Sequence, residues 1–179
     1  MTTRLITPPA APALSPEEAR TAARRTDTAL DAELAIYVSA FTTIAEHETG
    51  RSIINRTYQE VLDTFPDAIR LYRPPIASVN FLKYYDESGT LQTLDPADYE
   101  LDVVNEGYIV PAPGKSWPAT QSGKINAVIV EYVAGYGADN TATPADFKAF
   151  IMSKIAEKYL SDKENPYLVC LLESKKVWG

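Results

Sequence analysis

The sequence predicts an α+β protein in which a core of long antiparallel helices carries an inserted antiparallel β-sheet. Two observations lead to this class. Apolar residues recur at helical spacing in segments 27–49 and 144–160, whereas the segment 54–133 is rich in β-branched and aromatic residues broken by short turns. No internal repeat or low-complexity linker divides the 179 residues. We therefore expect a single domain, with a helical core at 15–50 and 144–178 and the sheet as a subdomain between them.

The N-terminal part is expected to begin with an extended arm. Residues 1–14 contain several prolines among alanines, which disfavours a helix. Ser15 and Glu18 then form a capping-box pattern that starts a short helix. Asp27 is a second start signal, and it precedes the longest helix of the chain, which Gly50 ends as a left-handed cap. The apolar stripe expected on this helix consists of Leu30, Leu34, Tyr37, Phe41 and Ile44.

The middle of the chain is expected to form an antiparallel sheet or a small barrel, because its strand-forming segments are short and closely spaced. We expect strands at 56–63, 69–71, 77–85, 90–94, 99–104, 108–110 and 127–133. Asp86–Gly89 is a four-residue turn that makes a hairpin. The segment 111–123 is a structured loop rich in proline and glycine. Trp117 in this loop either plugs the end of the sheet, which we favour, or touches a neighbouring subunit.

The C-terminal part returns to helix. Thr143–Pro144 is a helix start and Asn165–Pro166 a helix end. The apolar segment Tyr167–Leu172 is expected to form one or two helical turns, and residues from Glu173 onward a tail. The only cysteine, Cys170, cannot form an internal disulfide, and its apolar neighbours predict a buried small hydrophobic side chain.

Patterns typical of a catalytic, cofactor or metal site are absent from the sequence. The single histidine, His47, lies between two glutamates near a helix end and has no second nitrogen or sulfur ligand at suitable spacing. The glycines match neither of the common phosphate-binding motifs. The acidic residues between Asp95 and Asp102 lack the spacing of a calcium loop. The sequence therefore predicts no enzyme, no cofactor and no metal.

The charge balance argues against a nucleic-acid-binding surface. The formal net charge is −7, and most of the acidity lies in the middle, with −3 for residues 1–50, −5 for 51–143 and +1 for 144–179. No apolar run approaches the roughly 20 residues that span a bilayer, and no secretory signal is recognised at the N-terminus. These features, together with the single cysteine, predict a protein of a reducing cytoplasm that does not enter membranes.

A series of short motifs runs in order through almost the whole chain. These are Leu5–Pro9, Ser15–Ala19, Glu48–Ile54, Arg73–Val79, Leu94–Tyr99, Gly114–Thr120 and Ala127–Gly137. Together they resemble the head–tail connector proteins (adaptors, or head-completion proteins) of long-tailed bacteriophages and gene transfer agents. The segment 21–25 departs from the pattern, because it lacks the larger aliphatic residues usual in the first helix of that family.

The resemblance implies a virion structural protein at the head–tail interface, made in the cytoplasm of a bacterial host from a phage, prophage or gene transfer agent genome. It implies a homo-oligomeric ring of about twelve copies. The ring would lie beneath the portal protein, extend the DNA channel without binding DNA specifically, and contact a downstream head-closure or tail protein. The acidic character of residues 51–143 would keep DNA from sticking to such a channel.

In related adaptors the C-terminal segment docks into the portal. Carried onto this sequence, the resemblance places the portal interface at Tyr167, Lys175, Lys176, Val177 and Trp178. The alternative for this segment is a frayed tail. Two alternative functions also stay open, a head-closure or tail-completion protein and a small soluble ligand-binding or enzymatic domain that uses the tyrosine-rich sheet.

Overall fold

The computed structural model describes residues 2–102, 107–160 and 165–177. Its helices are α1 (Pro16–Ala22), α2 (Asp31–Thr49), α3 (Ala145–Leu160) and the 3₁₀ helices η1 (Pro96–Asp98), η2 (Asn140–Ala142) and η3 (Pro166–Lys175). Its strands are β1 (Thr2–Thr7), β2 (Arg56–Leu62), β3 (Ile69–Arg70), β4 (Ile76–Tyr85), β5 (Leu91–Thr93), β6 (Tyr99–Asp102), β7 (Tyr108–Pro111) and β8 (Val128–Ala134). The α+β class with antiparallel strands is confirmed.

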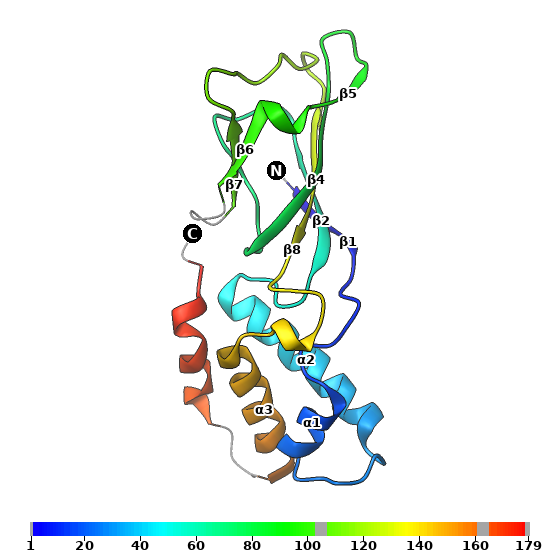
Figure 1. Cartoon of the computed structure of the whole chain (residues 1–179), viewed down its shortest axis with the longest axis vertical. Coiled ribbons are helices and arrows are strands. Elements are labelled where there is room, and N and C mark those ends of the chain that lie inside the picture. Colours follow the sequence, from blue (N-terminus) through cyan, green and yellow to red (C-terminus); the bar gives the residue numbers. More distant parts are fainter. Residues whose placement is uncertain (1, 103–106, 161–164, 178–179) are drawn as a thin grey trace. The chain divides into compact units, whose positions relative to one another are not determined.

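The chain divides into two compact units (Figure 1). The sheet unit comprises Met1–Pro8 and Arg56–Gly135, and the helical unit comprises Pro9–Asn55 and Tyr136–Gly179. The single domain expected from the sequence stays a prediction. The helical unit is smaller than the expected core of long helices, because α1 and η3 are short and only α2 and α3, of those described, exceed ten residues.

The sheet unit contains two antiparallel sheets, one with the strand order β1-β2-β8-β4-β5 and the other with the order β3-β7-β6. Strand β2 alternates between half-buried and buried positions, because successive side chains point to opposite faces. Its neighbour β8 alternates in the same way, with Tyr132 fully buried. Residues 2–7, expected as part of an extended arm, pair with β2 and form the edge strand of the larger sheet. The last two residues of the strand expected at 99–104 lie outside the described residues.

The loop between β7 and β8 contributes Trp117 to the core of the sheet unit. The ring of Trp117 stacks on the ring of Phe65, with 4.8 Å between centroids and 9° between planes. Phe65 also contacts Tyr84. Trp117 is therefore partly buried against the core of the sheet unit, and its contact with a neighbouring subunit stays a prediction.

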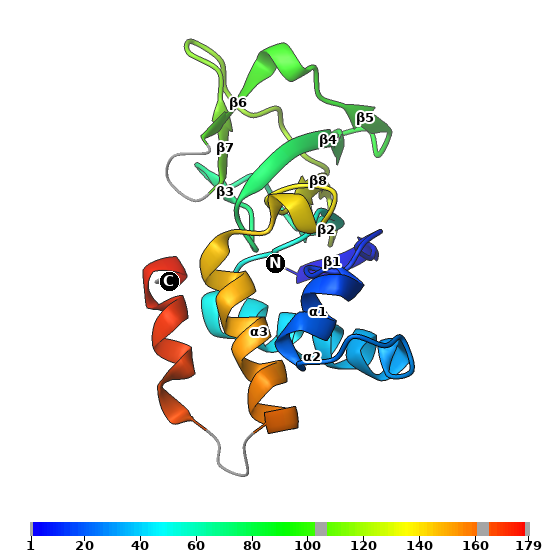
Figure 2. The same ribbon diagram turned by 60° about the horizontal axis from the view of Figure 1, so that its bottom comes forward.

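The helical unit is built on local signals that the sequence shows clearly. Ser15 accepts a hydrogen bond from the Glu18 amide while the Glu18 carboxylate accepts one from the Ser15 amide, so the capping box is present. Gly50 ends α2 in the left-handed conformation, with φ of 69°. Both views of the ribbon place α3 between α1 and η3 (Figures 1 and 2), and α3 contacts each of them.

The start of α2 and the last residue of its apolar stripe differ from the prediction. The helix begins at Asp31, because the Asp27 carboxylate accepts the Ala29 amide in a local turn and caps no helix. Four residues of the expected stripe do face the core, since Leu34 is buried and Leu30, Tyr37 and Phe41 pack against it. Ile44 departs from the prediction, because it is 43% exposed whereas Ala45 is fully buried. The carboxylate of Glu46, next to Ala45, also lies inside and accepts the amide of Ile53 at 2.9 Å.

The C-terminal segment also differs from the prediction. Helix η3 continues to Lys175, so the expected tail from Glu173 is partly helical. Cys170 is exposed, which corrects the expectation of a buried side chain. The reason is the period of a 3₁₀ helix, because three residues per turn align Val169 with Leu172 on the inner face and leave Cys170 outside.

Candidate interaction surfaces

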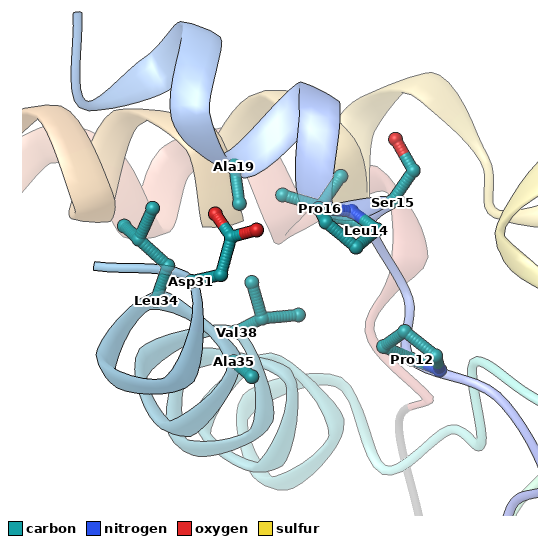
Figure 3. A pocket seen from close by; sticks show the side chains of 9 residues that line it. All are labelled: Pro12, Leu14, Ser15, Pro16, Ala19, Asp31, Leu34, Ala35 and Val38. Atoms are coloured by element: carbon teal, nitrogen blue, oxygen red, sulfur yellow. The ribbon is translucent and has the colours of Figure 1, made fainter. Parts of the chain in front are cut away.

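A groove lies between the first two helices of the helical unit (Figure 3). We call it the α1–α2 groove, and its volume is about 70 Å³. Its apolar lining includes Pro12, Leu14, Ala19, Leu34, Ala35 and Val38. A groove of this size admits part of a side chain, since a single water needs only about 10–15 Å³ on a comparable measure.

The groove exists because the residues of α1 that meet α2 are small. Ala19, Ala22 and Ala23 are all buried, and α1 contacts both α2 and α3. Of these three alanines, Ala19 lines the groove. Small side chains leave space beside Leu34 that a larger residue would fill.

One carboxylate oxygen in the α1–α2 groove has no hydrogen-bond partner among the residues that the structure describes. Asp31 binds the guanidinium of Arg20 through Oδ2 at 2.7 Å, whereas its Oδ1 is buried and unpaired. Figure 3 shows the Asp31 carboxylate between Ala19 of α1 and Val38 of α2. A buried acceptor without a donor costs about 1–3 kcal/mol.

The predicted portal residues divide between the two ends of η3. Tyr167 lies in the first turn and is 75% exposed. Lys175, Lys176 and Val177 lie at the other end, about 16–20 Å away at 2 Å per residue. Trp178 lies outside the described residues. The structure therefore does not gather the described predicted residues into one cluster.

Internal contacts hold the residues at the end of η3. The ammonium of Lys175 lies 3.4 Å from the carboxylate of Asp146, and that of Lys176 lies 2.7 Å from Glu173. The hydrogen bond to Glu173 raises the pKa of Lys176. The amide of Val177 donates to the Thr49 carbonyl at 2.9 Å. Up to residue 177, the segment is thus anchored at the end of α2.

The other acidic and histidine side chains considered in the sequence analysis make local structural contacts or are exposed. Asp95 caps η1, and Asp98 lies 3.1 Å from the ammonium of Lys115. Within the described ranges, no group of three or more metal-binding side chains occurs, and His47 is exposed at the end of α2. No helix of this part of the chain is both long and apolar enough to cross a bilayer.

Among the described residues of the sheet unit, Glu60 is a buried acidic side chain that the sequence pattern did not indicate. Glu60 of β2 is fully buried, and its Oε2 accepts the hydroxyl of Thr3 at 2.5 Å. Its Oε1 has no partner in the described residues. Burial raises the pKa of Glu60, an effect that the Thr3 hydrogen bond partly offsets. Burial, and the nearby Glu60 charge, also raise the pKa of Tyr132.

The fold is similar to that of chains in gene transfer agent (GTA) particles. A chain in the neck of an empty GTA particle, computed with C6 symmetry, superposes with a TM-score of 0.80 at 24% identity. A chain in the virion of a native GTA particle gives 0.80 at 25% identity, and one in the neck of a native particle, computed with C12 symmetry, gives 0.74 at 23%. Each match covers 100% of this chain and 97% of the other.

The other two comparisons found no relative. No protein-family model matches the sequence, and no curated protein matches it. The similarity therefore consists of a shared fold over the whole chain at low identity.

Proposed function

We propose that this protein is a structural head–tail connector subunit of a tailed bacteriophage, prophage or gene transfer agent. The observation that carries the proposal is the full-length similarity in fold to chains of GTA particles, two of them in the neck. The ordered motifs from Leu5 to Gly137 give the same assignment from the sequence. In this role the protein is made in the bacterial cytoplasm and acts in the virion, where it joins the head to the tail without catalysing a reaction.

The subunits form a ring beneath the portal and extend the DNA channel. The C6 and C12 symmetry of the similar necks supports a cyclic arrangement of about twelve copies. The net charge of −7 supports a channel along which DNA passes without specific binding, because an acidic surface repels phosphates. The downstream partner is a head-closure or tail protein.

The surface that faces the portal is the C-terminal end of η3. Lys175 and Lys176 provide positive charge there, and the next two residues in the sequence, Val177 and Trp178, are apolar. The anchoring of Val177 to Thr49 supports this role, because a fixed backbone loses little entropy when a partner binds. Tyr167 is too far along the helix to be required for the same contact, although it was part of the predicted interface.

Electron microscopy of particles made without this gene tests the proposed function. We expect DNA-filled or leaking heads beside free, complete tails, because the joint between them is missing. Heads joined to defective tails would instead indicate a tail-completion protein. Normal particles would refute a neck role and favour the ligand-binding alternative.

Copurification with the portal protein of the same particle tests the assigned surface. Lys176→Glu reverses a charge at the end of η3 and is expected to weaken binding to the portal. Lys115→Glu is the matched control, since Lys115 is an exposed lysine of the sheet unit that also pairs with a carboxylate, that of Asp98. Equal loss in both variants, or in neither, would contradict the assignment of this surface.

A further inference from the structure

We propose that the outer face of α2 is the surface through which one subunit contacts a neighbouring copy of this chain in the connector ring. The inference rests on the proposed function, because it assigns the lateral contact of that ring. The outer face of α2 consists of the exposed residues that lie between Glu33 and His47, namely Ala35, Ile36, Ser39, Ala40, Thr43 and Ile44.

The outer face of α2 carries no charge. Residues 35–44 contain no charged side chain, which amounts to nearly three turns at about 3.6 residues per turn. The other long helix, α3, has Lys148, Lys154 and Lys158 at positions that solvent reaches. The exposed side of a surface helix is normally polar and charged, whereas a helix that lacks charge all round is normally buried. We therefore expect the outer face of α2 to be covered in the assembled protein.

The shape of this face suits close packing against another chain. Ile36 is 69% exposed and Ile44 is 43% exposed, so each offers apolar surface for burial. The side chains between them are small, and the hydroxyl of Thr43 donates to the Ser39 carbonyl at 3.0 Å within the same helix. That hydroxyl therefore needs no donor site on a partner. Ala35 also lines the α1–α2 groove (Figure 3), so the face continues into a hollow that admits part of a side chain.

The charge of the chain selects a second copy as the occupant. Each copy has a formal net charge of −7, so two copies repel each other wherever their charged surfaces meet. An uncharged face avoids this repulsion, whereas a basic partner would bind acidic residues, which here flank the face as Glu33 and Glu48 and are absent from it. The necks that contain similar chains have C6 and C12 symmetry, in which copies are lateral neighbours. Because a cyclic contact is heterologous, the outer face of α2 meets a different surface of the neighbouring copy.

Photo-crosslinking in assembled particles tests the inference. A p-benzoylphenylalanine replaces Ile36, whose side chain is mostly exposed, so the core of the helical unit is left intact. On irradiation we expect a product of two linked copies, with the link mapped by mass spectrometry from position 36 to a segment outside α2. Ile125 is the matched control, because it is an isoleucine of similar exposure, 75%, in the sheet unit. Crosslinker at position 125 is expected to give little of this product.

The outcomes separate the inference from the proposed function. A link from position 36 to the portal or to another protein would overturn the inference, as would no link at all. A link between the α2 helices of two copies would also overturn it, because such a link indicates a two-fold contact and not a cyclic one. In each case the neck role stands as long as the protein is found in the neck. Absence of the unmodified protein from the neck would instead refute the proposed function, and the inference with it.

A second set of variants covers the case in which the bulky crosslinker prevents assembly. Ile36→Glu should lower the yield of particles with joined heads and tails by about tenfold or more, because an unpaired charge is costly to bury in the contact. The purified variant should still unfold at the wild-type urea midpoint, since position 36 is exposed within the subunit. Ile125→Glu adds the same charge elsewhere and Ile36→Val keeps the apolar contact, so both should give the wild-type yield. A wild-type yield from Ile36→Glu would overturn the proposal.

Discussion

Replacing Glu60 with glutamine should stabilise the protein at neutral and alkaline pH. Oε2 of Glu60 accepts a hydrogen bond from Thr3, but Oε1 is buried without a partner among the described residues. Glutamine keeps a carbonyl oxygen as an acceptor for Thr3 and removes the charge. What remains is one amide group with incomplete hydrogen bonding, which costs less than a buried carboxylate with incomplete hydrogen bonding.

The size of the effect follows from the cost of that carboxylate. An unsatisfied buried polar group costs about 1–3 kcal/mol, and a charged one more. We therefore expect Glu60→Gln to raise the free energy of unfolding by about 1–3 kcal/mol at pH 8. The pKa of Glu60 is raised in the folded state. The wild-type side chain thus contributes its full stability below the unfolded-state pKa and loses it as pH rises through the folded-state pKa, by at most about 1.4 kcal/mol per pH unit.

Urea unfolding at pH 5 and pH 8 measures this difference. A Trp178→Phe background leaves Trp117 as the fluorescent reporter of the sheet unit that contains Glu60. Glu100→Gln is the control, because Glu100 is exposed on β6 and its replacement should change stability by less than about 0.5 kcal/mol. The prediction is wrong if the Glu60→Gln variant has no higher free energy of unfolding than wild type at pH 8, or if this difference does not grow from pH 5 to pH 8.

Three further predictions concern single side chains. Tyr132→Phe removes the hydroxyl that donates to the Tyr72 carbonyl at 3.0 Å, and should cost about 1–2 kcal/mol in urea unfolding; no loss would show that water replaces this donor. Ser15→Ala removes the cap of α1 and should cost about 1 kcal/mol in the same assay, whereas an unchanged midpoint would mean that the cap contributes nothing. Hydrogen bonds from the Ser88 hydroxyl and neighbouring groups lower the pKa of Asp86 to about 2, so the stability that its ionised form contributes should persist above the usual carboxyl pKa and be lost as pH falls toward 2. NMR titration of Asp86 checks this, and a midpoint near 3.8 would contradict the hydrogen-bonded turn.

The features that the sequence by itself determined depend on groups a few residues apart. Ser15 and Glu18 satisfy each other's amides within one turn, so the start of α1 is visible in the sequence. Gly50 ends α2 because a residue without a Cβ adopts the left-handed conformation at little cost. The strand-forming run that begins at Arg56 became β2 with alternating burial. In each case the determining interaction is local.

The candidate site was only partly visible. The resemblance to connector proteins pointed to the C-terminal segment as an interface. In the structure, Tyr167 of that segment is exposed on η3. The α1–α2 groove was not predicted from the sequence. A missing side chain becomes a groove only when another helix lies beside it, and the position of α2 relative to α1 is not written in a local pattern.

Only the tertiary structure decided which faces are buried. Ile44 and Ala45 are both apolar, but Ala45 is buried together with Glu46, whose carboxylate accepts the amide of Ile53, and Ile44 is 43% exposed. Glu60 is buried because β1, more than fifty residues earlier in the chain, supplies Thr3 as its donor. The periodicity of helices and strands predicts which residues share a face. The side to which that face turns depends on long-range partners, whose contributions no local spacing encodes.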